Sequence, residues 1–135
     1  MSDDDQYAED RLAREPVIWL TTVRSDGQPQ TSPVWFVWDG TSFLIYSMPS
    51  SQKVPNIRGN PKVSLNLDGN GTGGGIVSIE GEARIDESAP AIPEVEAYVV
   101  KYAEMIRAMG AEPEPFAKEY STPIRVTPTR RRIYR

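Results

Sequence analysis

The chain has 135 residues, a formal net charge of −4, and neither cysteine nor histidine. A length of this order suits one domain with one hydrophobic core, and the acidic balance argues against nucleic acid as the main partner. The missing residue types exclude disulfides, Cys/His zinc sites, thiol nucleophiles and Ser-His-Asp triads. An enzyme built from this chain would therefore take its chemistry from a cofactor.

The sequence gives no sign of a membrane or secretory segment. Its apolar runs fall short of the roughly 20 residues that span a bilayer. The start, MSDDDQYAED, is acidic and polar, the opposite of a signal peptide. No EF-hand-like cluster of Asp and Glu suggests a metal site. We expect a single domain over residues 1–135, in the cytoplasm, with no metal and no membrane or nucleic-acid partner.

The N-terminal half predicts one short helix followed by strands. Residues 3–15 are acidic at the front and basic behind, which suits a helix that Pro16 ends. Residues 16–48 predict three strands in a meander, because SDGQ and WDGT supply Asp-Gly hairpin turns. Valine, isoleucine, threonine and aromatic residues fill the intervals, as strands favour. Residues 62–69 predict a further strand.

The glycine-rich segment GNGTGGG, residues 69–75, contains a G-x-G-x-x-G match. A dinucleotide fingerprint needs a helix directly after it. The alternating pattern IVSIEGEARI follows instead and predicts a strand. We therefore interpret this segment as a hairpin connection and not as a phosphate loop.

The C-terminal half predicts the one long helix and the last strand. Residues 94–109 carry an apolar stripe that Gly110 ends, and residues 113–120 suggest one or two further helical turns. Residues 122–135 predict one strand, or two strands broken at Pro128. Five to seven mostly antiparallel strands with one long helix predict a small, mainly β barrel.

Two segments carry side chains whose role the pattern leaves open. In the terminal RRRIYR, alternate arginines would lie on opposite faces of a strand, which favours a charged edge over a basic patch. Contact of one arginine with a phosphate is the alternative. The run PVWFVW, residues 33–38, is apolar on both faces and suits a core or a dimer seam. Burial is expected for Phe36, and Trp35 is compatible with a cofactor wall.

The segment SSQKVPNIRGNP, residues 50–61, is the strongest candidate for a binding site. Ser50, Ser51 and Gln52 offer short hydrogen-bonding side chains at a predicted helix start, with Lys53 just inside it. Backbone N–H groups, the helix dipole and an ammonium would converge there, which suits a phosphate. An ordinary capped surface helix explains the same residues equally well, and the segment alone does not decide between them.

The chain from about residue 16 to residue 83 resembles the pyridoxamine 5'-phosphate oxidase-like split-barrel superfamily. The resemblance lies in WLTTVRSDGQPQTSPVWFVWDGTSFLIYS followed by KVPNIRGNPKVSLNLDG. Within the superfamily it is nearest to small actinobacterial oxidoreductases that use coenzyme F420 or FMN. It implies a six-stranded split β-barrel of the FMN-binding kind, with two or three flanking helices. It also implies a homodimer with two cofactor sites at the subunit interface.

The resemblance further implies where a cofactor would lie. The cofactor phosphate would sit near Tyr46 to Lys53 with Lys53 as its ion-pair partner, and the ring system along the backbone of Pro33 to Phe36. Asn56 would brace the turn. The predicted cofactor-binding residues are Pro33, Val34, Trp35, Phe36, Tyr46, Ser47, Ser50, Ser51, Gln52 and Lys53.

The activity that the resemblance implies is that of an F420-dependent oxidoreductase. It would transfer hydride between the deazaflavin C5 and an unsaturated small-molecule substrate. The alternatives are an FMN-dependent oxidoreductase and a flavin or haem carrier without turnover. No catalytic side chain is predicted. The substrate of true pyridoxamine phosphate oxidases is not expected, since the histidine they use for it is missing here.

Overall fold

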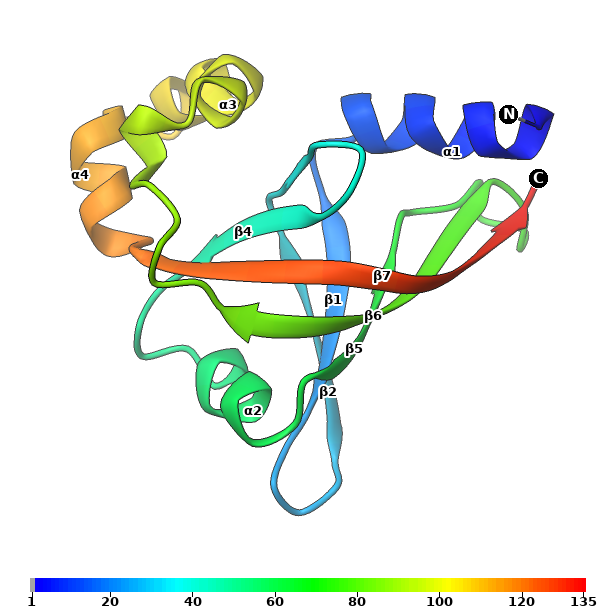
Figure 1. Cartoon of the computed structure of the whole chain (residues 1–135). Coiled ribbons are helices and arrows are strands. Elements are labelled where there is room, and N and C mark those ends of the chain that lie inside the picture. The colour runs from blue at the N-terminus through cyan, green and yellow to red at the C-terminus, as the bar shows by residue number, and fades with distance from the viewer. Residues whose placement is uncertain (1) are drawn as a thin grey trace.

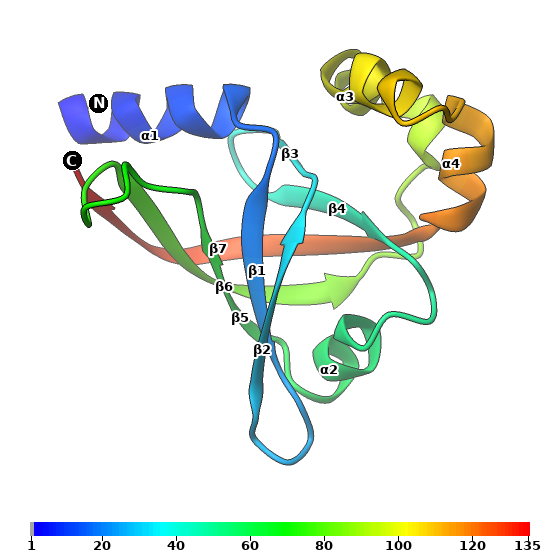
Figure 2. The same ribbon diagram turned by 180° about the vertical axis from the view of Figure 1, so that it is seen from behind.

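A computed structural model describes residues 2–135 as one curled antiparallel sheet with helices at its ends (Figures 1 and 2). The strand order is β2-β1-β5-β6-β7-β4-β3. The strands are β1 (Ile18–Val23), β2 (Pro29–Val34), β3 (Val37–Trp38), β4 (Phe43–Ser47), β5 (Lys62–Asn66), β6 (Ile76–Ile85) and β7 (Thr122–Tyr134). The helices are α1 (Asp3–Arg14), α2 (Lys53–Gly59), α3 (Glu96–Ala108) and α4 (Pro113–Glu119), with a 3-10 turn at Ile92–Glu94.

The predicted split-barrel class is confirmed, although the described sheet has seven strands and not six. The difference arises at Trp35 and Phe36, where the expected strand over residues 33–38 divides into β2 and β3. The described chain also has four α-helices and not two or three, since the one or two turns expected at residues 113–120 form the short helix α4. In the view of Figure 1, α1 and α3 lie above β7 and α2 lies below it.

Local sequence signals account for most of the strand connections. Gly27 and Gly40 have φ values of 88° and 92°, the left-handed conformation that glycine adopts without strain, in the two Asp-Gly turns. Residues 122–134 form one continuous strand across Pro128. A register shift opposite Glu80 and Gly81 accommodates that proline, in keeping with the preference of strand prolines for bulges.

Two apolar clusters fill the molecule. The larger one lies inside the curled sheet and includes the fully buried side chains of Ile18, Leu65 and Ile124. The smaller one lies where α3 and α4 meet the outer side of β4, and Tyr98 and Tyr102 are its most buried aromatic residues. The second cluster matters for function, because it is continuous with the candidate site.

Helix α1 and the C-terminal arginines hold the far end of the barrel closed. Arg11 donates to the carbonyl oxygens of Asp68 at 2.6 Å and Gly75 at 2.7 Å, which are at the two ends of the glycine-rich connection. Arg131 pairs with Asp5 at 2.8 Å, and it also reaches a second carboxylate of α1 at 3.4 Å. Arg135 pairs with Asp4 at 3.4 Å. These arginines thus connect α1 to the glycine-rich connection and to β7 at one end of the barrel. No helix in the described part of the chain is long and apolar enough to cross a membrane.

Candidate functional site

A cavity of about 300 Å³ lies where the end of β2, the end of β4 and the start of α2 meet α3 and α4. We refer to it as the Lys53 cavity. Seven of the ten predicted cofactor-binding residues line it. They are Pro33, Val34, Trp35, Tyr46, Ser47, Ser51 and Lys53.

Lys53 is the only cationic side chain among the described residues that line this cavity. Its side chain is half-buried, and Nζ donates a hydrogen bond to Ser51 Oγ at 2.8 Å. None of the ion pairs among residues 2–135 includes Lys53. Burial lowers the pKa of Lys53, because the charged form is less well solvated there. A bound anion would supply the missing charge partner.

The start of α2 differs from the expected anion-binding helix terminus. The helix begins at Lys53, and Gln52 precedes it with helical φ and ψ and no side-chain cap. The amide N–H groups of Ser51, Val54 and Asn56 already bond to backbone carbonyls, and proline at position 55 has no N–H. Few backbone donors are therefore left for an anion at this helix start, and the Lys53 ammonium is the main donor there.

Three predicted residues do not line the cavity. Ser50 is exposed, and the side chain of Gln52 is exposed and turns along α2 to donate to Asn56 Oδ1 at 3.0 Å. Phe36 is fully buried in the barrel core, as its apolar character predicted. Its side chain therefore cannot touch a ligand in the Lys53 cavity, and any role for Phe36 lies in its backbone.

Asn56 holds α2 against the sheet, as predicted. It is buried, and Nδ2 donates to Thr22 Oγ1 and to Gln30 Oε1, each at 2.9 Å. These two bonds join α2 to β1 and β2. The position of Lys53 at the first turn of α2 is thereby fixed relative to the end of β2.

The Tyr102 hydroxyl on α3 fixes the chain directly after the cavity wall. It accepts the backbone N–H of Phe36 at 2.9 Å. It also lies 2.6 Å from the carbonyl oxygen of Pro16 and 3.0 Å from that of Phe36, the two acceptors for its single hydrogen. Phe36 thus bonds to a side chain instead of a neighbouring strand, and this is why β2 and β3 are separate. Burial raises the pKa of Tyr102, so the hydroxyl stays neutral.

A stack of aromatic rings forms the wall on the helical side. Trp35 lies parallel to Tyr102, with ring centroids 4.6 Å apart and an interplanar angle of 3°. Its ring centroid is 5.4 Å from that of Phe116 on α4, and Phe116 stacks on Tyr120 at 4.5 Å. Such a stack offers a rigid, flat and apolar surface.

Tyr46 contributes a ring to the cavity, while its hydroxyl is engaged elsewhere. The hydroxyl donates to the carbonyl oxygen of Pro90 at 2.5 Å, and the ring meets that of Tyr98 edge-on at 5.3 Å. Burial raises the pKa of Tyr46 to about 12. Tyr46 is therefore poorly suited to give up a proton near neutral pH.

Sequence reasoning missed four residues of the cavity. Met48 directly follows β4, and the other three are aromatic residues in α3, in α4 and directly after α4. Tyr98 lies within the predicted helix over residues 94–109 and is almost fully buried. The i, i+4 spacing of Phe116 and Tyr120 was a signal of a shared helical face, although nothing local connects that face to Lys53. The four residues are Met48, Tyr98, Phe116 and Tyr120.

The family model described as Pyridoxamine 5'-phosphate oxidase matches residues 4–134. The chain belongs to this family. Its match extends through α3, α4 and β7, well beyond the segment that carries the sequence resemblance. No curated protein sequence matches the chain.

Solved structures with this fold include several members of the family. A putative pyridoxamine 5'-phosphate oxidase from Listeria innocua has a TM-score of 0.69 at 23% identity, over 98% of each chain. A structure titled F420 reductase has a TM-score of 0.66 at 25% identity, over 92% of this chain and 94% of that one. HutZ, a haem storage protein from Vibrio cholerae, has a TM-score of 0.66 at 17% identity, over 99% and 96%. The names of these proteins thus refer to different ligands, F420 in one and haem in another.

Replacing Tyr102 by phenylalanine tests the link between α3 and the cavity wall. The Phe36 amide would lose its acceptor in a buried position, which costs about 1–3 kcal/mol. We expect Tyr102→Phe to lower the free energy of unfolding by that amount in a urea titration. We also expect the Phe36 and Trp35 amide signals to move in NMR spectra.

Tyr134→Phe is the matched control, because this tyrosine is half-exposed near the end of β7. It should change neither quantity. If Tyr102→Phe were as stable as the control, the hydroxyl would not hold the chain at Phe36.

Proposed function

We propose that this chain is an oxidoreductase that holds a flavin-type cofactor in the Lys53 cavity. The observation that carries the proposal is the half-buried Lys53 ammonium, which has a hydroxyl neighbour and no carboxylate partner among residues 2–135. A phosphate is the partner that such a group binds well, through charge-assisted hydrogen bonds. The backbone of Pro33 to Trp35 and the aromatic wall suit a flat ring system.

Coenzyme F420 is the cofactor we favour, and FMN is the alternative. The F420 reductase structure is 25% identical to this chain and is matched over nearly its whole length. A FAD-binding protein from Mesorhizobium loti has the same TM-score at 19% identity. Both cofactors that we consider carry a phosphate, so Lys53 would serve either of them.

The chain's own residues would bind and orient the cofactor and exclude water from it. Lys53 and Ser51 would hold the phosphate, and the Tyr102 hydroxyl would keep the Pro33 to Phe36 segment in one position. Phe116 would help to screen the ring from solvent. A bound flavin or deazaflavin supplies the capacity for hydride transfer to an unsaturated substrate.

Two tyrosines of the chain are poorly placed to supply a proton to the cofactor or its substrate. Tyr46 has a raised pKa and a bonded hydroxyl. Tyr134 is the last residue of β7, whereas the first residue, Thr122, pairs with Ser47 at the cavity. Tyr134 is therefore at the opposite end of the strand from the cavity. Neither tyrosine is placed to protonate a ligand beside Lys53.

A haem carrier is the second candidate, since HutZ shares the fold. The chain contains neither histidine nor cysteine, two of the common axial ligands of haem iron. Oxidation of reduced F420 by quinones, enones or biliverdin, accelerated by the protein, would support the enzyme. Tight binding of haem, together with no such acceleration by either cofactor, would favour the carrier.

Replacing Lys53 by alanine tests the proposed phosphate contact. A charge-assisted hydrogen bond is worth about 1.5–3 kcal/mol, so Lys53→Ala should weaken binding of F420 and FMN roughly tenfold to a hundredfold. Lys53→Arg should recover part of the affinity, because the charge persists while its geometry changes. Added salt should weaken cofactor binding to the wild type more than to Lys53→Ala. Fluorescence titration at two ionic strengths measures all three effects.

Lys62→Ala is the matched control for this titration. Lys62 is exposed at the start of β5 and does not line the Lys53 cavity. Its loss should change cofactor affinity little. Equal affinities and equal salt dependence for the wild type and Lys53→Ala would reject the phosphate site.

We further propose that two copies of the chain complete the site. The cavity of one chain, about 300 Å³, is at the small end of the range for organic ligands. Met48 on its rim is 37% exposed, which leaves apolar surface for a second subunit to cover. Sedimentation velocity at micromolar concentration should give a dimer. A monomer that binds either cofactor with full affinity would contradict a shared site.

A further inference from the structure

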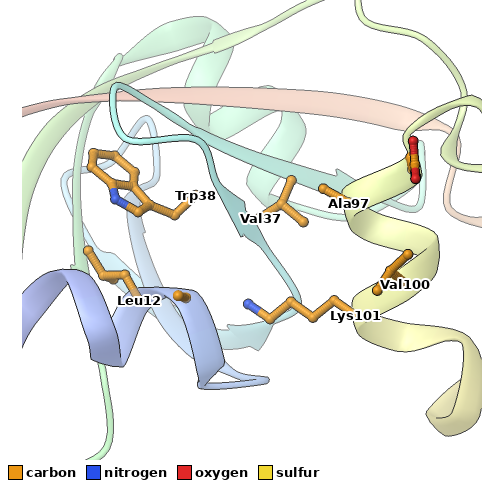
Figure 3. A pocket seen from close by; sticks show the side chains of 8 residues that line it. Leu12, Val37, Trp38, Ala97, Val100 and Lys101 are labelled. Atoms are coloured by element: carbon orange, nitrogen blue, oxygen red, sulfur yellow. The ribbon is translucent and has the colours of Figure 1, made fainter.

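A second and larger cavity, of about 740 Å³, lies between α1, β3 and α3 (Figure 3). We refer to it as the Lys101 cavity. It shares no lining residue with the Lys53 cavity. The two cavities lie on either side of Phe36, since Trp35 lines one and Val37 lines the other. Its volume is within the range of pockets for small organic ligands.

Lys101 reaches from α3 across this cavity toward Leu12 of α1 (Figure 3). Its side chain is half-buried, and Nζ donates to the carbonyl oxygen of Phe36 at 3.0 Å. Nζ also lies 3.8 Å from the centroid of the Phe36 ring and 5.4 Å from that of Tyr102. All of these partners are neutral. None of the ion pairs found in the described chain includes Lys101.

The other walls of the cavity are mostly apolar. Val37, Trp38, Ala97 and Val100 line it, and Val100 is 75% exposed. The one carboxylate in the described lining is that of Glu96. It lies five residues before Lys101, a rotation of about 140° around the helix axis.

We propose that the Lys101 cavity binds a small amphipathic carboxylate, with its acid group on Lys101 Nζ and its apolar body against Val37, Ala97 and Val100. One ammonium without a second cation or a lining hydroxyl suits a single negative charge better than a phosphate. The apolar walls require a ligand with a substantial hydrocarbon part. This site is independent of the proposed flavin site.

The affinity for such a ligand depends on the protonation of Lys101. Burial lowers the pKa of Lys101 to about 8, and Glu15 opposes that shift. Glu15 is itself paired with Arg11 at 2.8 Å, Glu96 lines the same cavity, and the nearby Tyr102 is neutral. A carboxylate binds the ammonium and not the free amine. Binding therefore weakens as the pH rises through about 8.

Octanoate is a suitable probe, and octanol is its neutral counterpart. Titration calorimetry of the full chain should show saturable octanoate binding at pH 7 that weakens by roughly tenfold or more at pH 9.5. Lys101→Met keeps much of the side-chain volume and removes the charge. It should weaken octanoate binding at pH 7 by a similar factor, abolish the pH dependence and leave octanol binding within about threefold.

Val100→Glu tests the apolar wall without touching Lys101. Because position 100 is exposed, the substitution should leave folding unchanged. A carboxylate there would repel the acid group of the ligand and remove apolar contact, and it should weaken octanoate binding by tenfold or more. Met109→Glu is the matched control, because Met109 is 61% exposed just after α3 and does not line the cavity. Neither variant should alter FMN binding, which separates this proposal from the flavin site.

Three results would overturn the carboxylate site. The first is the absence of saturable octanoate binding to the wild type. The second is equal octanoate affinity in Val100→Glu and Met109→Glu. The third is a change of oligomeric state in Val100→Glu by sedimentation, which would assign this face to a second copy of the chain.

Discussion

The hydroxyl of Tyr102 is the contact on which the functional half of the molecule depends. It accepts the backbone N–H of Phe36, 66 residues away in sequence, and its single hydrogen can go to the carbonyl oxygen of Pro16 or of Phe36. This contact lies between the end of β2, which pairs with β1, and the start of β3, which pairs with β4. Residues before Phe36 then face the Lys53 cavity, and residues after it face the Lys101 cavity. The same contact attaches α3 to the sheet and positions the aromatic wall.

The two cavities share the same arrangement of charge. In each, a half-buried lysine donates to a neutral oxygen and has no carboxylate partner in the described chain. Several arginines of the same chain are paired with carboxylates, as Arg131 is with Asp5. Burying an ammonium without a partner costs free energy, and a bound anion offsets that cost. A lysine at either position therefore lowers stability unless an anion binds beside it.

Local signals in the sequence predicted the parts of the fold that are themselves local. The Asp-Gly turns and the stop at Gly110 follow from backbone preferences of single residues. Lys53 could be singled out because it follows polar residues at a helix start. The break at Phe36 could not be predicted, since it requires a hydroxyl from a distant helix. The contribution of Phe116 likewise depends on the packing of α4 against Trp35.

The central claim is that the Lys53 cavity holds the phosphate of a flavin-type cofactor. A crystal structure of the chain grown with FMN, and one grown with F420, would test it most directly. The account predicts a phosphate oxygen within hydrogen-bond distance of Lys53 Nζ and the ring system against the backbone of Pro33 to Trp35. A phosphate bound at the C-terminal arginines or in the Lys101 cavity, with Lys53 still bonded only to Ser51, would contradict it.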